Sequence, residues 1–275
     1  MLTEHSKIYY INSNDRISGT DSRFTISIPY YPQDNFNTVC VLQAVIPKSY
    51  YLIRPGLNTF TLQENFVNTT IIIPIGNYSR RSLESTVQNL LNANSPNSIG
   101  YTISWPSSTQ PHTGKFTFTC TDIGGIQPIF IFDDNELSNR LGFQENSSNQ
   151  FVGFQLQSTN VIDLQAQNII YLHSDICNTD KDDILQEFYV STGDADFSNI
   201  HYTVPDVEVY SKQLVSKTKQ VYTFYLTDEN SKEIHLNGIN MGFSLLLYRK
   251  NNNDDIIKNY IQYKMLNEDK YINLN

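Results

Sequence analysis

The sequence predicts an all-β protein, a sandwich of about eight strands interrupted by a small α+β subdomain. Three observations predict it. Polar and apolar residues alternate along most of the chain, which is the period of a half-buried strand. Val, Ile, Thr, Tyr and Phe fill these segments, while Gly, Pro, Asn, Asp and Ser separate them. Helical periodicity is confined to short stretches, the clearest of them in the middle of the chain.

The first part of the chain contains strand patterns only. Arg23–Ile28 places three apolar residues on one face and stops at a proline. Thr38–Pro47 is apolar on both faces in its first half, which is typical of a central, covered strand. Ile8–Ile11 and Asn58–Gln63 alternate in the same way as Arg23–Ile28.

A compact block of mixed elements follows. Its clearest helix is Ser79–Asn92, where Ser79 is a suitable N-cap and the apolar side chains form one stripe: Leu83, Val87, Leu90 and Leu91. A shorter helix is expected over Asn135–Leu141, before Gly142 as its stop. The strands expected around them are Thr69–Pro74, Tyr101–Trp105, Lys115–Thr121 and Ile129–Phe132. We expect Gly124–Gly125 to form a turn and Asn146–Asn149 to be a solvated loop.

Strands resume after this block, at Asn168–His173, Leu185–Ser191, Ile200–Val204, Val221–Thr227 and Gly242–Arg249. The expected organisation is therefore a sandwich formed by residues 1–65, with its first three strands, and 155–250, with its last five. Residues 66–154 form the inserted subdomain, and 251–275 form a tail or arm in which Asp254–Met265 is a weaker helix candidate.

Charge and hydropathy exclude several functions. The formal net charge is −9 and the pI is about 5.0, whereas proteins that grip phosphate backbones are usually basic. We therefore expect no sequence-specific or non-specific nucleic-acid binding. The longest apolar runs, Ile71–Ile75 and Phe243–Tyr248, are far too short to span a bilayer. The first twenty residues carry no secretory signal, so we expect a protein that is not secreted.

Motifs for catalysis, cofactors and metals are missing from the sequence. No nucleophile elbow, zinc helix, P-loop or dinucleotide fingerprint occurs. The acidic stretches Asp180–Asp183 and Gly193–Asp196 lack the ligand spacing of a calcium loop and are interpreted as solvated loops. Cys40 and Cys120 lie in strand patterns and are interpreted as buried small hydrophobes, and Cys177 lies far from both along the chain. The five histidines are isolated along the chain: His5, His112, His173, His201 and His235. We expect no enzyme, no catalytic residue, no cofactor and no metal site.

Several strings resemble one viral protein family in their order and spacing. They are IYYINSNDRISGTDSRFTISI at Ile8–Ile28, VCVLQAVIPKSYYLI at Val39–Ile53, NTFTLQE at Asn58–Glu64, IPIGNYS at Ile73–Ser79, YTISWPSSTQPHTGKFTFT at Tyr101–Thr119, LGF at Leu141–Phe143, HSDIC at His173–Cys177, LQEFYV at Leu185–Val190, VYSKQL at Val209–Leu214 and TFYLTDENSKEIHLNGINMGFSLLLY at Thr223–Tyr248. The chain resembles the pentons, or minor capsid vertex proteins, of virophages and of polinton-like and adintovirus-like DNA viruses. Within that family it is nearest the mavirus type of virophage penton.

The resemblance implies a single eight-stranded jelly-roll sandwich. It implies a structural protein of the virion, a homopentamer at each icosahedral vertex of a double-stranded DNA virus particle. Its partners would be copies of itself and the double-jelly-roll major capsid protein of the same virus. It would be assembled in the host cytoplasm, and the insertion is a candidate for contact with a host receptor. In this interpretation the shared core contains Phe24, Ile26, Val41, Leu42, Val45, Phe60, Phe224, Leu226, Phe243, Leu245 and Leu247.

Two other function classes remain open. One is a receptor- or carbohydrate-binding β-sandwich, an attachment module, which is compatible with loops rich in Asn, Thr and Tyr. The other is a hydrolase on a jelly-roll scaffold, which would need a carboxylate pair or a metal cluster. A native mass measurement and a glycan-binding assay separate the capsid protein from the attachment module, and turnover of glycosides tests the hydrolase.

Overall fold

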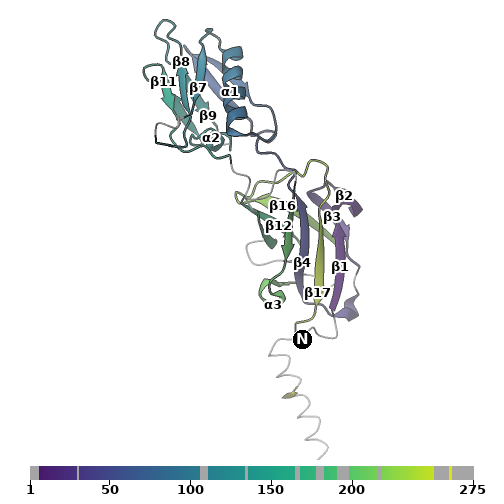
Figure 1. The fold of residues 1–275 in the computed structure, drawn as a ribbon. Coiled ribbons are helices and arrows are strands. Elements are labelled where there is room, and N and C mark those ends of the chain that lie inside the picture. The colour runs from purple at the N-terminus through teal and green to yellow at the C-terminus, as the bar shows by residue number, and fades with distance from the viewer. Residues whose placement is uncertain are drawn as a thin grey trace, which may run out of the picture. The chain divides into compact units, whose positions relative to one another are not determined.

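The chain folds into two compact units, drawn in Figure 1 from a computed structural model. The structure describes residues 6–29, 31–105, 111–133, 136–164, 168–177, 183–190, 198–215, 219–250 and 260–261. Unit 1 comprises Met1–Tyr50 and Gln167–Asn275, and unit 2 comprises Tyr51–Ala166. Unit 2 therefore interrupts unit 1 in the sequence. Each unit has a hydrophobic core of its own.

Unit 1 contains two antiparallel sheets. The first has the strand order β1 (Ser6–Asn12), β17 (Gly242–Tyr248), β4 (Thr38–Pro47) and β14 (Asn199–Thr203), and the short β15 (Lys212–Gln213) also pairs with β4. The second has the order β13 (Ile184–Tyr189), β12 (Ile169–Ser174), β16 (Val221–Asp228), β3 (Arg23–Ser27) and β2 (Ser18–Gly19). Figure 1 shows β4, β17 and β1 running side by side in the first sheet.

The strands of unit 1 with five or more residues follow a definite order between the two sheets. Along the described chain they are β1, β3, β4, β12, β13, β14, β16 and β17. The first sheet contains the first, eighth, third and sixth of these, and the second sheet contains the second, seventh, fourth and fifth. Neighbours in a sheet are therefore mostly distant in sequence. The first and eighth strands pair along their full length, from Ser6 opposite Tyr248 to Asn12 opposite Gly242.

The core of unit 1 lies between its two sheets, as the alternating patterns predict. Phe224 of β16 meets Phe243 of β17 across the sandwich, with ring centroids 5.1 Å apart. The expected core is wrong at Val45, which is 40% exposed. A β-bulge at Ser244/Leu245 shifts the register of β4, so that Ala44 faces the core and Val45 opposes a glycine on the outer face. Leu42 is half-buried on that outer face, in a small cluster with Cys40, Leu246 and Tyr248.

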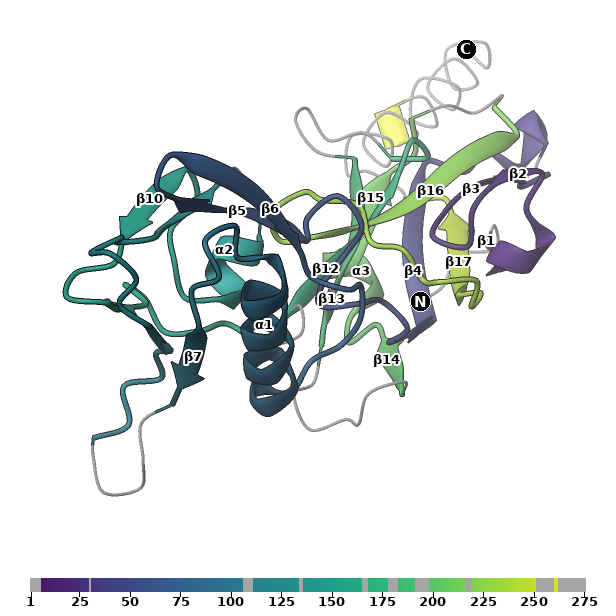
Figure 2. The same ribbon diagram turned by 90° about the horizontal axis from the view of Figure 1, so that it is seen from above.

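Unit 2 contains two smaller antiparallel sheets and two helices. One sheet has the order β10 (Ser147–Gln150), β9 (Ile129–Phe132), β5 (Thr59–Glu64) and β6 (Val67–Ile72). The other has the order β11 (Gln155–Gln157), β8 (Thr117–Cys120) and β7 (Tyr101–Ser104). Helix α1 (Arg80–Asn94) packs on β6 and β7, and α2 (Leu137–Arg140) packs on β5 (Figure 2).

Phenylalanine dominates the core of unit 2. Phe60 stacks on Phe132 with centroids 5.3 Å apart, and Phe118 meets Phe130 edge-on at 5.2 Å. Phe60 was expected in the sandwich core, and this expectation is wrong. Its strand β5 pairs with β6 and β9, which gives residues 58–63 to unit 2 and moves the beginning of that unit from 66 to 51. The return to unit 1 likewise lies after residue 166 instead of 154, because β11 pairs with β8.

The two helices in the middle of the chain are confirmed. The Ser79 side chain accepts a hydrogen bond from the Ser82 amide and the Ser82 side chain accepts one from the Ser79 amide, which forms a reciprocal cap. Gly142 follows α2 with a φ of 78°, and a Cβ there would lie 2.6 Å from the Asn160 carbonyl oxygen, so only glycine fits.

One predicted loop is wrong. Residues 146–149 were expected to be solvated, but Ser147–Gln150 forms β10, an edge strand paired with β9. Its Ser and Asn side chains carry no apolar alternation, so the pairing comes from backbone hydrogen bonds to β9 and not from a buried face. The possible helix at 254–265 falls outside the described residues except at Tyr260 and Ile261, which are helical. The helices that the structure describes are all too short or too polar to cross a membrane.

Candidate functional surfaces and polar clusters

Among the described residues that the sequence singled out for chemistry, His173 and Asp183 come together, and the others lie apart. Of the acidic stretch 180–183 the structure describes only Asp183, and residues 193–196 lie outside the described part. His201 and His235 are exposed, and His112 contacts Trp105, with Nε2 3.2 Å from the indole Nε1. Within the described residues, no group of three His, Cys, Asp or Glu side chains is placed to hold a metal ion.

The cysteines are separate free thiols. Cys40 and Cys177 are buried, and Cys120 is half-buried. Desolvation raises the pKa of the Cys40 thiol to about 11 and that of Cys177 to about 12. Burial, reinforced by the carboxylates of Glu64 and Asp122, raises the pKa of Cys120 to about 11. Thiols with such pKa values are poor nucleophiles at neutral pH, which fits packing and not catalysis.

A polar cluster missed by the sequence analysis lies on the second sheet of unit 1. The His173 Nδ1 atom lies 2.7 Å from Asp183 Oδ1, and its Nε2 atom lies 2.8 Å from Thr227 Oγ1. Tyr225 donates a hydrogen bond of 2.6 Å to the other Asp183 oxygen. The guanidinium of Arg23 lies over the Tyr225 ring at 4.1 Å. The hydrogen bonds of this cluster could not be predicted from the sequence. The two-residue spacing of Tyr171 and His173, which places both on one face of a strand, was visible there.

Asp183, His173 and Thr227 have the connectivity of an acid, a base and a hydroxyl nucleophile. However, Thr227 is only 5% exposed, so its hydroxyl is closed to a substrate. Burial alone would raise the pKa of Asp183, but hydrogen bonds from Tyr225 and His173 outweigh it and hold the pKa below its usual value. Desolvation and the bond to Asp183 raise the pKa of Tyr225 to about 12. The cluster acts as a clamp that joins β12, β16 and the residue preceding β13.

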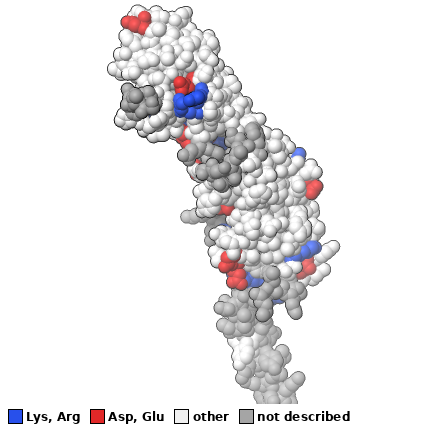
Figure 3. Space-filling view, in the orientation of Figure 1, with Lys and Arg blue, Asp and Glu red and all other residues white. Residues whose placement is uncertain are grey.

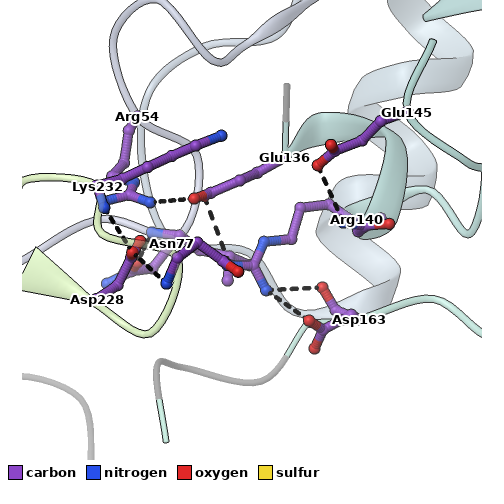
Figure 4. Close-up of polar contacts among 11 residues, drawn as sticks. Arg54, Asn77, Glu136, Arg140, Glu145, Asp163, Asp228 and Lys232 are labelled. Carbon is purple, nitrogen blue, oxygen red and sulfur yellow. Dashed lines mark hydrogen bonds and ion pairs between the residues drawn. The ribbon is translucent and has the colours of Figure 1, made fainter. Parts of the chain in front are cut away.

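Unit 2 contains an ionic network, shown in Figure 4, in which Arg54, Glu136 and Arg140 are buried and Asp163 is half-exposed. Arg54 donates a 2.5 Å hydrogen bond to Glu136, and both side chains are less than 10% exposed. Arg140 lies 4.0 Å from Glu136 and 3.1 Å from the Asp163 carboxylate. These four side chains link the segment before β5, helix α2 and the segment near the end of unit 2. Arg54 and Asp163 lie far from α2 in the sequence, so only the i,i+4 spacing of Glu136 and Arg140 is visible without the structure.

A second buried carboxylate in unit 2 is Glu64, at the end of β5. It accepts hydrogen bonds from the Ser95 hydroxyl at 2.8 Å, the Asn97 amide at 3.0 Å and the Tyr101 hydroxyl at 2.6 Å. Burial, together with the bond to Glu64, raises the pKa of Tyr101 far above its usual value. Three donors thus satisfy a carboxylate that is 0% exposed, and they tie the loop between α1 and β7 to the end of β5.

The remaining candidate for function is an exposed sheet edge. Strand β1 pairs with β17 on one side and with no described strand on the other. Its outer-face residues Ile8 and Tyr10 are 46% and 82% exposed. On the face that Figure 3 shows, charged side chains are scattered over a surface that is mostly neither basic nor acidic. A regular strand edge with exposed apolar side chains and few charges is a typical template for association.

The likeness of the chain to known proteins lies in its structure. No protein-family model matches the chain. No curated protein sequence matches it either. Among solved structures, the chain is similar to the selenomethionine-labelled penton protein of mavirus, with 14% sequence identity and a TM-score of 0.47 over 88% of this chain and 98% of that one. That protein is of the type that the sequence strings resemble.

Proposed function

We propose that the protein is a structural capsid protein that forms the pentameric vertex of a double-stranded DNA virus particle. It would act by self-assembly and by contact with a double-jelly-roll major capsid protein, in virions assembled in the host cytoplasm. No catalytic step is part of this function. Its support comes from the fold of unit 1 and from the strings that resemble virophage pentons.

The observation that carries the proposal is the strand order of unit 1. The division of eight strands into first, eighth, third and sixth against second, seventh, fourth and fifth supports a jelly roll of two Greek keys. Jelly rolls of this kind are typical of viral capsid and lectin domains. The fold alone does not select between these, and the family strings favour the capsid protein.

The β1 edge supplies a contact for ring formation. Five copies close a ring when one surface of each copy meets a different surface of the next. Tyr10 and Ile8 stand beside the edge of β1 that pairs with no described strand, so that a neighbouring chain gains both apolar contact and main-chain hydrogen bonds there. Several modest contacts made together stabilise a closed ring.

The test is the native mass of the full chain at tens of micromolar, alone and after coexpression with the major capsid protein of the same virus. We expect a pentamer, or incorporation at particle vertices. Tyr10→Asp should abolish assembly, because it places a charge in the contact. Tyr189→Asp, at an equally exposed tyrosine on the second sheet, should leave it intact. A chain that stays monomeric alone and is absent from coexpressed particles would refute the proposal.

A carbohydrate-binding attachment module is the second candidate. One observation favours it: Tyr189 is 75% exposed on the outer face of the second sheet, the face that also carries Tyr171 and Tyr225. Exposed aromatic rings beside polar groups suit sugar contacts. A strict monomer that binds glycans, and loses that binding in Tyr189→Ala, would favour this function over the capsid protein.

A further inference from the structure

Four connections of unit 2 meet at the end where β5 stops. They are residues 65–66, 95–100, 122–128 and 151–154, which we call the distal loops. Glu64 holds the second of these through Ser95 and Asn97. The third and fourth are joined because the Phe154 amide donates a 3.1 Å hydrogen bond to the Gln127 side chain. The loops therefore form one fixed surface and not four independent tips.

The turn between β5 and β6 presents an aromatic ring in an unfavourable backbone conformation. Glu64 opposes Val67, so Asn65 and Phe66 are the two central residues of the hairpin turn, with φ values of 47° and 66°. Turns of this kind favour glycine at the second position, because a side chain there is strained. Phe66 is nevertheless 93% exposed. Neither its strain nor its exposure benefits the fold, which points to contact with something outside the chain.

Aliphatic side chains extend this surface. Val152 is 80% exposed, Val67 is 48% exposed and Ile123 is 37% exposed. The turn at Gly153 and Phe154 repeats the pair of positive φ values, at 59° and 64°, and Val152 lies directly before this turn, opposite Gln155. Three neighbouring loops thus each carry an exposed apolar side chain.

Charge is nearly missing from the same surface. The distal loops contain no Lys or Arg. Their one acid is Asp122, whose carboxylate accepts a 2.9 Å hydrogen bond from the Gly125 amide, and Glu64 beside them is buried. Asn65 and the polar residues of the loop that follows α1 supply amides and hydroxyls around the apolar tips.

We propose that the distal loops insert their apolar tips into a zwitterionic lipid bilayer. Sugars stack on broad aromatic faces, which Val152 and Ile123 lack. Protein hot spots are enriched in Trp, Tyr and Arg, none of which is exposed in these loops. Anionic membranes attract Lys and Arg, which are also missing. An uncharged set of protruding Phe, Val and Ile side chains suits the neutral interface between headgroups and acyl chains, where polar neighbours remain among the headgroups.

The test is flotation of the full chain with vesicles of pure phosphatidylcholine at low and high salt. We expect binding that is insensitive to salt. Phe66→Gly should lower the partition coefficient about tenfold or more, since it removes a buried aromatic contact. Glycine also relieves the turn, so this variant should melt at the same temperature as the parent or higher. Val152→Ser should weaken binding in the same direction. Val209→Ser, at a 73% exposed valine of unit 1, is the matched control and should bind as the parent does.

Three results would overturn the proposal: no flotation with phosphatidylcholine, flotation that Phe66→Gly leaves unchanged, or flotation only with anionic vesicles and only at low salt. Retention of a proteinaceous or glycan receptor through Phe66, without vesicle binding, would also overturn it. The inference is independent of pentamer formation. Native mass and incorporation into coexpressed particles separate the two. A chain that floats but stays monomeric and is absent from the particles refutes the vertex protein alone, and a pentamer that does not float refutes the lipid contact alone.

Discussion

The imidazole of His173 lies flat against the phenol ring of Tyr225, with ring centroids 4.6 Å apart and planes 9° from parallel. The two residues face each other across β12 and β16, and both bind the carboxylate of Asp183. One side chain just before β13 therefore fixes two rings on two other strands. This relationship predicts how the stability of unit 1 depends on pH.

Asp183→Asn should remove an acid-sensitive part of the stability. Because the folded pKa of Asp183 lies below its ordinary value of 3.8, the carboxylate stabilises the fold above about pH 3.8, and that contribution is lost as the pH falls through the folded pKa. The melting temperature of the parent minus that of the variant should shrink below pH 4. Thermal melts from pH 2 to 6 measure this difference, and a constant difference over that range would contradict the prediction.

Breaking the buried ion pair of unit 2 should destabilise it strongly. Arg54→Met leaves Glu136 charged and without its hydrogen-bond donor in a buried site, which costs about 3–5 kcal/mol. Arg80→Met, which breaks the half-exposed pair of Arg80 with Glu84, is the control and should cost about 0.3–0.5 kcal/mol. Denaturant unfolding measures both, and equal effects would show that the Arg54 pair contributes no more than a surface pair.

The contribution of the α1 N-cap to stability should be measurable by removing a single hydroxyl group. Ser79→Ala removes the acceptor for the Ser82 amide and should lower the free energy of unfolding by about 1 kcal/mol. Ser85→Ala, inside the same helix and exposed, should be neutral or slightly stabilising, because alanine has the higher helix propensity. The prediction fails if the two variants unfold at the same denaturant concentration.

The three thiols should react in an order set by burial. At pH 8, iodoacetamide should modify Cys120 first, because it is half-buried, and should reach Cys40 and Cys177 only on unfolding. Since burial raises the pKa of Cys40 and Cys177 above their ordinary 9.0, their contribution to stability is present below pH 9 and is lost as the pH rises through about 11 to 12. Mass spectrometry of the alkylated chain follows the order, and early modification of Cys177 would contradict it.

Much of the strand pattern was predictable, because one buried face leaves a period of two in the sequence. Thr38–Pro47 and Ile129–Phe132 match β4 and β9 residue for residue. The ends of unit 2 were not predictable in the same way, since β5 alternates as a sandwich strand would and only its pairing with β9 assigns it to unit 2. Strand β10 escaped prediction because a polar edge strand has no buried face to reveal it.

The polar clusters were less predictable still. Arg54 and Glu136 lie 82 positions apart, and nothing local distinguishes them from solvated charges. His173 and Tyr225 are likewise joined only by strand register. Phe66 differs from these clusters, because part of its signal lies in the local sequence. A phenylalanine after asparagine in a turn was visible in the sequence, but its exposure depends on the hairpin register that makes it a central turn residue.

The pairing of β1 with β17 has a consequence for how the chain folds during synthesis. Strand β1, which begins at Ser6, pairs with β17, which ends at Tyr248. Almost the whole chain must therefore be synthesised before the first sheet of the sandwich can form completely. Unit 2 is one continuous stretch, Tyr51–Ala166, with a hydrophobic core of its own, and it is free to fold first. Once folded, it replaces the flexible chain between β4 and β12 with a compact unit, so that less chain entropy remains to be lost when the late strands pair. The interruption of the sandwich thus becomes the step that prepares its completion.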